Sequence, residues 1–228
     1  MNNSIQKHAG SRYSTISMVQ VAIFSAIICI MAFTPFLGYI PLGFTRATII
    51  HIPVIIASLL MGPKKGGALG FLFGLTSFIN NTVNPTVTSF VFTPFYNLGE
   101  FSGGIGSVII CFIPRILVGI VPFYIYKLVM RFVSEETKKK GVSGIGLVLA
   151  GISGALVNTL LVMNMIFLFF RDAYAQANEV ASSAVYTFIL SVIGMNGVPE
   201  AIVAGILTLC IGKVLMKKNI RERLGFSL

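Results

Sequence analysis

Six apolar runs, separated by charged or turn-forming residues, dominate this sequence. The runs cover residues Ser17–Phe33, Arg46–Met61, Gly66–Asn81, Gly104–Met130, Gly144–Phe170 and Ala184–Met216. A helix of about 20 apolar residues crosses the hydrocarbon core of a bilayer. Only 11% of the 228 residues are charged, against about a quarter in soluble domains, so the chain cannot cover a water-facing surface. We therefore expect an all-α integral membrane protein with six transmembrane helices.

The runs differ in length, and this difference predicts their behaviour. The second and third are short for a full crossing, whereas the last three are long enough to tilt, kink or project. The stretch Gly194–Pro199 should bend or break the sixth run, because proline lacks a backbone N–H. The chain is expected to divide into a cytoplasmic N-terminal segment (1–16), a six-helix transmembrane domain (17–216) and a basic cytoplasmic tail (217–228).

Basic residues gather at alternate ends of the runs. Fourteen of the 17 Lys and Arg residues belong to the two chain ends and to the connections after the second and fourth runs. By the positive-inside rule, these four regions and both termini are cytoplasmic. The opposite connections are longer and rich in Pro, Asn and Thr, above all between Asn80 and Asn97. Long ordered loops are often lids or binding loops, which indicates a binding pocket that faces outward.

Small residues recur every four positions on three of the runs. They are Ala22 and Ala26 on the first, Gly66, Gly70 and Gly74 on the third, and Gly146, Ala150 and Gly154 on the fifth. Such stripes let membrane helices approach closely, and each taken alone is more often internal packing than a docking surface. The alanine pair gains weight only if the protein must bind a partner inside the membrane.

Polar residues from five runs converge on one depth. We counted 1.5 Å per residue from the nearest cytoplasmic lysine, or from the expected helix start at Gly144. The count places five residues about 18–22 Å from the cytoplasmic side: Arg115, Glu200, His51, Asn80 and Asn158. Unrelated polar residues would scatter in depth, so the shared level predicts a polar pocket in the outer half of the membrane.

The residue types indicate what this pocket binds. The planar fork of Arg115 matches a carboxylate, although Arg115 and Glu200 can also satisfy each other as a structural ion pair. His51 taken alone is more often a hydrogen-bonded core residue than a ligand contact. Amide groups suited to hydroxyls and amides come from Asn80, Asn81, Asn84, Asn158, Asn164 and Asn196. Together these groups favour a small, polar ligand that can carry a negative charge.

Several chemistries find no support in the sequence. Gly62–Gly66 lacks the spacing and the Ser or Thr of a Walker A loop, so the chain is not expected to hydrolyse ATP. No nucleophile–base pair and no His, Cys and carboxylate cluster is evident, so we expect neither an enzyme nor a metal or cofactor site. An autonomous ion-coupled permease remains an alternative, because Glu200 and Arg115 can relay protons.

The chain resembles the substrate-binding S components of energy-coupling factor (ECF) vitamin transporters, most of all the pantothenate-type members. The resemblance covers nearly the whole chain and includes the Ala22/Ala26 pair. It is carried by the stretches Phe44–Pro53, Gly70–Ser77, Asn84–Phe90 and Asn196–Val203.

The resemblance implies a vitamin-capture subunit in a bacterial plasma membrane, with an S-component-like helical bundle. Such a subunit docks on a transmembrane coupling protein and two cytoplasmic ATPases, and Ala22 and Ala26 match the positions that contact the coupling protein. Pantothenate is the expected vitamin, with Arg115, or Arg46 at the outer lip, binding its carboxylate. Riboflavin, pyridoxine and hydroxymethylpyrimidine remain alternative ligands.

Overall fold

The structure, a computed structural model, describes residues 2–34, 37–42, 45–99, 101–134, 136 and 142–225. Its helices are α1 (Asn2–Phe33), α2 (His51–Met61), α3 (Pro63–Val83), η1 (Ser89–Val91), α4 (Ile105–Val118), α5 (Val121–Phe132), α7 (Gly144–Ala177), α8 (Val185–Val192), η2 (Ile193–Gly197), α9 (Val198–Leu215) and α10 (Lys218–Arg223). Two short antiparallel hairpins pair β1 (Tyr39–Leu42) with β2 (Thr45–Thr48), and β3 (Asn97–Leu98) with β4 (Phe101–Ser102). The fold is predominantly helical, as predicted, and the two hairpins are additions that the apolar pattern did not indicate.

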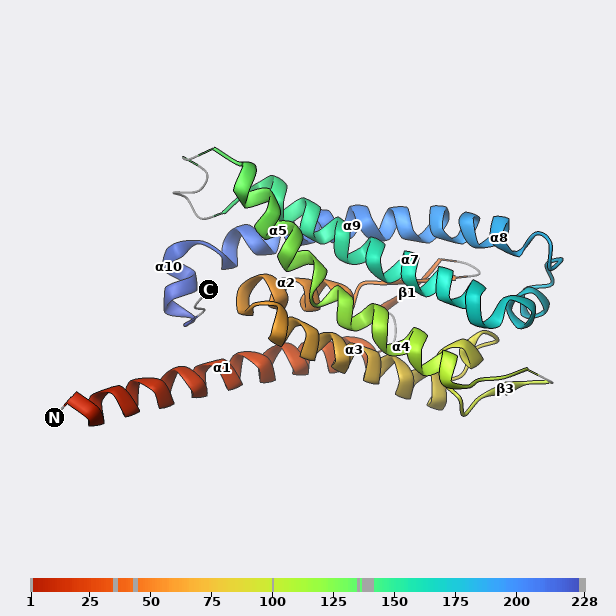
Figure 1. The fold of residues 1–228 in the computed structure, drawn as a ribbon, viewed down its shortest axis with the longest axis horizontal. Helices are drawn as coiled ribbons and strands as arrows, with labels where there is room; N and C mark the ends of the chain where they lie inside the picture. The colour runs from red at the N-terminus through yellow and green to blue at the C-terminus, as the bar shows by residue number, and fades with distance from the viewer. Residues whose placement is uncertain are drawn as a thin grey trace.

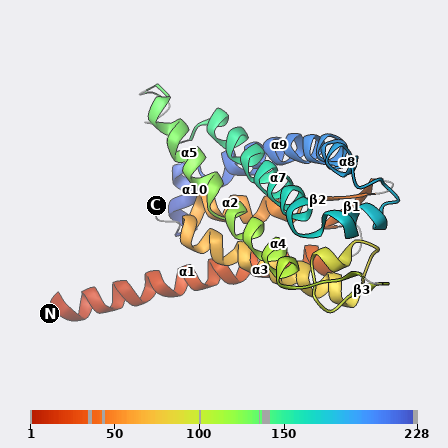
Figure 2. The same ribbon diagram turned by 45° about the vertical axis from the view of Figure 1, so that its right-hand side comes forward.

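The helices form an elongated bundle (Figures 1 and 2). The start of α1 and all of α10 lie at the same end of this bundle as the end of α5 and the start of α7, and α1 projects beyond its neighbours there (Figure 1). Both hairpins lie toward the opposite end (Figure 1). The basic connections and the polar, Pro- and Asn-rich connections are therefore separated along the long axis, as the charge pattern predicts.

Four helical segments in the described part of the chain are long and apolar enough to cross a membrane. They are Thr15–Phe33, Ile105–Phe132, Gly144–Ala177 and Val185–Leu215. These segments match the first, fourth, fifth and sixth apolar runs. The third run forms α3, which at 21 residues also has the length of a crossing and carries Lys64 and Lys65 in its first turn.

The second run differs from the expected helix Arg46–Met61. Its first residues form β2, and α2 begins only at His51 and has 11 residues, or about 16 Å. Every residue of α2 is buried, and the helix packs against α1, α3, α4, α5, α7 and α9. A helix that is apolar all round is stable only inside a bundle, so α2 is the central helix of this fold.

The fourth run is divided between α4 and α5 by a break at Gly119 and Ile120. Pro122 sits in the first turn of α5, where its missing N–H costs least. The backbones of Gly119 and Gly66 touch there, so a side-chain Cβ at either position would collide with the other's carbonyl oxygen. The break thus follows from proline chemistry and from the close approach of α3.

The last two runs contain local distortions. In α7, Phe170 has φ −136° and ψ 27°, and the helix continues past this kink to Ala177. Between α8 and α9 the chain adopts the π-helical turn η2, which includes Asn196 and Gly197. The bend predicted for Gly194–Pro199 is therefore a π-turn that keeps the helix continuous, a distortion common at functional sites.

Two separate hydrophobic clusters form the interior. The larger surrounds α2 and includes Ile55, Phe73 and Ala204, while the smaller lies beneath the β3–β4 end and includes Phe90 and Ile166. The glycine stripe of α3 faces α4, and the stripe Gly146, Ala150 and Gly154 faces α5 and α2. Both stripes serve internal helix packing.

Candidate functional site

A layer of polar side chains lies between the two hydrophobic clusters. In α4, Arg115 falls between Ile110 of the smaller cluster and Val118 of the larger one. The same order recurs in α7 around residues 158 and 159, and in the α8–α9 helix around residues 196 and 200. We call this set the polar layer: His51, Arg115, Asn158, Thr159, Asn196 and Glu200. Each of its members is buried. Four of the five residues counted to one depth belong to it, and Asn80 does not.

The position of Arg115 follows from the proline that precedes it. Pro114 lies inside α4 and has no N–H to donate to the carbonyl of Ile110, four residues earlier. The side chain of Arg115 turns back toward the helix N-terminus, and its Nη1 donates to that carbonyl oxygen at 2.8 Å. Pro114 therefore leaves the Ile110 carbonyl oxygen without a backbone donor, and Arg115 supplies the missing donor. This hydrogen bond fixes the position of the guanidinium.

The guanidinium of Arg115 is held between two aromatic rings. Its central carbon lies 5.6 Å from the ring centre of Phe73 and 5.1 Å from that of Phe92. Nη2 is 3.5 Å from the hydroxyl of Ser77, and the buried Nε has no hydrogen-bond partner among the described residues. The side chain is only 7% exposed, and no carboxylate among the described residues lies within 4.0 Å of it. A buried cation without an anion is costly, so this site favours an anionic ligand group.

The close packing of α3 on α4 sets the level of Arg115. Gly70 faces the backbone carbonyl of Arg115, and a Cβ at Gly70 would collide with that oxygen. This approach also brings Phe73 and Ser77, one and two turns further along α3, to the guanidinium. One glycine thus permits the contacts that surround the charge.

The connection between α3 and α4 folds over this end of the bundle. Ser89, Phe90, Val91 and Thr93 are completely buried, and the Ser107 hydroxyl donates to the Phe90 carbonyl at 2.6 Å. The same segment supplies Phe92 to Arg115. Residues 89–93 of the loop expected to be a lid are therefore packed on the bundle and directly contact the site. We call residues 89–93 the lid segment.

Glu200, in the first turn of α9, forms the second charged centre. Its Oε1 accepts from the Thr48 backbone N–H at 2.5 Å, and its Oε2 accepts from the Thr159 hydroxyl at 3.1 Å. The carboxylate thereby joins β2, α7 and α9. It is 7% exposed and has no cation within 4.0 Å among the described residues.

Arg115 and Glu200 do not form the direct ion pair considered from the sequence. No ion pair joins them among the described residues, and each side chain is held by other partners. Neither charge is therefore neutralised by direct contact with the other. This arrangement suits a ligand with an acidic end and hydrogen-bond donors elsewhere.

Two further members of the polar layer have unused hydrogen-bonding atoms. Among the described residues, neither ring nitrogen of the fully buried His51 makes a well-formed hydrogen bond, although the Thr48 backbone lies beside the ring, and Oδ1 of Asn158 has no partner. Buried polar atoms without partners are rare in proteins and call for an explanation. A polar ligand that donates and accepts hydrogen bonds is such an explanation.

The remaining asparagines lie at the edge of the site or away from it. Asn81 is half-buried, and its Nδ2 donates to the Ser77 carbonyl while its Oδ1 accepts from Ser89, so it holds the lid segment. Asn80 and Asn84 hydrogen-bond to each other, with Asn84 exposed. Asn164 is exposed and donates to the Leu160 carbonyl of its own helix, so the structure does not bring it to the polar layer.

Arg46 and Asn196 were also expected at the site. The side chain of Arg46 lies outside the described residues. Asn196 is buried in η2, within the polar layer. In the described chain, no three His, Cys, Asp or Glu side chains are grouped as metal ligands would be.

Sequence reasoning did not single out four residues that contact the charged centres. Ser77, Phe73 and Phe92 surround Arg115, and Thr159 binds Glu200. Counting depth along the helices would have identified two of them, Ser77 and Thr159. Ser77 is 12 residues from Lys65 and Thr159 is 15 from Gly144, or about 18 and 22 Å.

The alanine pair of α1 lies on a different surface. Ala22 and Ala26 are exposed, one turn apart, on the side of α1 that faces away from the bundle. Small exposed side chains permit a partner helix to approach the backbone closely. The pair is thus accessible to a partner within the membrane.

Comparison with known proteins gives consistent results. The family described as "ECF transporter, substrate-specific component" matches residues 17–212. A relative named pantothenic acid transporter PanT, from Lactococcus lactis subsp. cremoris, is 36% identical over 199 residues, which cover 86% of this chain and 92% of that protein. A second, named pantothenate transporter PanT, from Leuconostoc mesenteroides subsp. mesenteroides, is 29% identical over 226 residues, covering 95% and 99%.

Proposed function

Because this chain belongs to the substrate-specific components of ECF transporters, we propose that it captures pantothenate in the membrane for import. The family assigns it a role in transport. The names of its two relatives and the chemistry of the polar layer both support this vitamin.

One observation carries the choice of ligand: the buried guanidinium of Arg115 has no anionic partner among the described residues. Pantothenate has a carboxylate, which a guanidinium binds with two parallel, charge-assisted hydrogen bonds. Riboflavin, pyridoxine and hydroxymethylpyrimidine have no carboxylate and would leave this charge unpaired. Arg115 therefore favours pantothenate over the alternative vitamins.

The other end of pantothenate has two hydroxyls and an amide. Glu200 can accept from a hydroxyl, while His51 and Asn158 supply the unused atoms described above. In this arrangement, the carboxylate lies toward α3 and α4, and the hydroxyls lie toward α7 and α9. Asn81, Asn196 and the lid segment complete the enclosure, with Asn80 and Asn84 at its rim.

The distribution of basic residues supports a six-crossing topology with both termini in the cytoplasm of a bacterium. Residues 1–16 and 217–228 are then the cytoplasmic segments on either side of the membrane domain. With this orientation, the lid segment faces the exterior, and ligand would reach the polar layer from that side once this segment moves.

The family implies a coupling protein and two ATPases as partners. The exposed Ala22 and Ala26 are the proposed contact with the coupling protein. Replacing both by leucine should prevent co-purification of the complex while pantothenate binding stays intact. Assembly that survives the double replacement would contradict this docking surface.

Calorimetry on the detergent-purified protein tests the ligand. We expect pantothenate to bind tightly, and riboflavin, pyridoxine and hydroxymethylpyrimidine to bind at least about 100-fold more weakly, a difference of about 2.7 kcal/mol. A stronger response to any of the other three would reject pantothenate. In vesicles containing this chain alone, an ion gradient should not drive pantothenate accumulation; accumulation would favour the permease alternative.

A further inference from the structure

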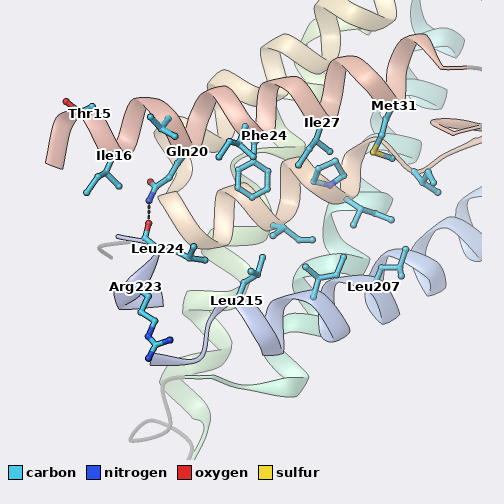
Figure 3. Close-up of a pocket in the computed structure, with 17 residues that line it drawn as sticks. Thr15, Ile16, Gln20, Phe24, Ile27, Met31, Leu207, Leu215, Arg223 and Leu224 are labelled. Atoms are coloured by element: carbon cyan, nitrogen blue, oxygen red, sulfur yellow. Dashed lines mark hydrogen bonds between the residues drawn. The ribbon is translucent and has the colours of Figure 1, made fainter. Parts of the chain in front are cut away.

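A groove of about 740 Å³ separates α1 from α9. Figure 3 shows Phe24, Ile27 and Met31 of α1 opposite Leu207 and Leu215 of α9. Residues of α2, Ile52 among them, form its floor. We call this cavity the α1 groove. It is distinct from the polar layer, and its membrane-depth lining is almost wholly apolar.

The groove exists because α1 is attached to the bundle along one side only. α1 packs on α3 and α2, whereas α9 packs mainly on α7 and α2. In the apolar part of α1, only 17% of the positions are buried, the lowest share among the four candidate spans. The space between α1 and α9 is therefore left for another apolar molecule.

One end of the groove is polar and basic. The Nε2 of Gln20 donates to the carbonyl of Leu224 at 2.8 Å, which ties α1 to the turn after α10. Arg223 lines the same end, is exposed, and has no hydrogen bond or ion pair among the described residues (Figure 3). The exposed Lys213 and Lys217 precede it along the chain but do not line the groove. An apolar channel that ends at an arginine matches a lipid with an anionic head group.

We propose that the α1 groove binds an anionic phospholipid of the cytoplasmic leaflet, with an acyl chain between α1 and α9 and the phosphate at Arg223. The assignment of this end to the cytoplasm rests on the proposed function. From Thr15 to Met31 the groove follows α1 for about 24 Å, more than the roughly 15 Å of hydrocarbon in one leaflet. An acyl chain thus fits along it in full.

Two other occupants fit less well. Pantothenate is polar throughout and would leave its hydroxyls and amide unpaired against the apolar walls. An apolar helix of a partner protein would fill the walls but would pair with Arg223 only if it carried an acidic residue at that level. A phospholipid satisfies both parts of the groove, because charge-assisted hydrogen bonds between arginine and phosphate are strong.

Native mass spectrometry of the purified full-length protein, titrated with phosphatidylglycerol or phosphatidylcholine in detergent, tests the proposal. We expect one phosphatidylglycerol to be retained, with at least about five-fold lower occupancy by phosphatidylcholine. Arg223→Gln should remove this preference, and Leu207→Trp should reduce binding of both lipids by filling the groove. The matched controls are Lys217→Gln, which removes a nearby charge outside the groove, and Ile206→Trp, which adds the same bulk beside it on the exposed face of α9.

The outcomes separate the lipid from other occupants. Equal retention of the two lipids, or an unchanged preference in Arg223→Gln, would overturn the role of Arg223. If Leu207→Trp retains as much phosphatidylglycerol as the unchanged protein, the groove is not the lipid site. If the same variant also fails to assemble with the coupling protein, the groove is the binding site of a partner helix instead. Pantothenate calorimetry on the same samples tests the proposed function separately, since its failure would leave the lipid result standing.

Discussion

The polar layer and the α1 groove are two sites of opposite construction. The polar layer is built by a few side chains from distant parts of the chain, and its two charged groups are fixed by hydrogen bonds, Arg115 by Ile110 and Glu200 by Thr48 and Thr159. The groove is built by many apolar side chains on α1, α2 and α9, with polar groups only at one end. We infer that the first site selects its ligand by hydrogen-bond geometry and the second mainly by shape.

This difference predicts unequal sensitivity to mutation. Replacing Arg115 or Glu200 leaves a buried partner without its hydrogen bond, and such a group costs about 1–3 kcal/mol. In the groove, one apolar side chain can replace another with little loss, provided that the volume is kept. Substitutions at four positions test this contrast.

Arg115→Ala should have the largest effect. It removes the proposed partner of the carboxylate and frees the Ile110 carbonyl, so we expect pantothenate affinity to fall at least about 100-fold in calorimetry. Arg115→Lys keeps the charge but loses the planar fork, and it should recover only part of the affinity. Unchanged affinity in a folded Arg115→Ala protein would refute the proposed role.

Glu200→Gln should weaken binding less, because the amide retains the shape and one acceptor oxygen. Exchange of a charged acceptor for a neutral one predicts a loss of about 10-fold, or about 1.4 kcal/mol. The loss should shrink when the ligand lacks one of its hydroxyls, since Glu200 is proposed to accept from that end. An equal loss for both ligands would assign Glu200 a structural role only.

The sequence indicated the polar layer more clearly than it indicated the contacts within it. The level of Arg115, Glu200, His51 and Asn158 could be counted, because rise per residue is fixed in a helix and lysines mark the membrane surface. The rotation of a side chain about its helix depends on packing. Asn164 therefore counted as a candidate although it faces outward and bonds to its own helix.

In the fold, too, features encoded by consecutive residues could be predicted, and features that depend on packing between distant segments could not. Apolar runs identified the long helices, since their signal lies in consecutive residues. The hairpin Tyr39–Thr48 overlaps the second apolar run only at Arg46–Thr48, so the apolar pattern contained little sign of it. The groove escaped prediction altogether, because a space between α1 and α9 depends on which helices pack together.

Gly70→Ala should have a moderate effect, transmitted through packing. The added Cβ meets the backbone carbonyl of Arg115, and overpacking of this kind costs about 1–3 kcal/mol. We expect a lower thermal midpoint and a several-fold loss of pantothenate affinity as α3 moves away with Phe73 and Ser77. The control is Gly194→Ala, whose Cβ would have no heavy atom within 4 Å. Equal effects of the two substitutions would argue against close packing at Gly70.

Leu207→Trp should change pantothenate affinity by less than about two-fold, the smallest effect in the series. Leu207 lines the α1 groove and is 36% exposed, and it lies on α9 seven residues beyond Glu200, about 10 Å along the helix axis. Tryptophan there fills space that pantothenate does not use. If calorimetry instead shows a loss as large as that of Glu200→Gln, the two sites are coupled through α9, and the α1 groove contributes to the geometry of vitamin binding. Phosphatidylglycerol titrated into the pantothenate-bound protein then has to change the vitamin's affinity as well, since coupling between two binding sites is reciprocal.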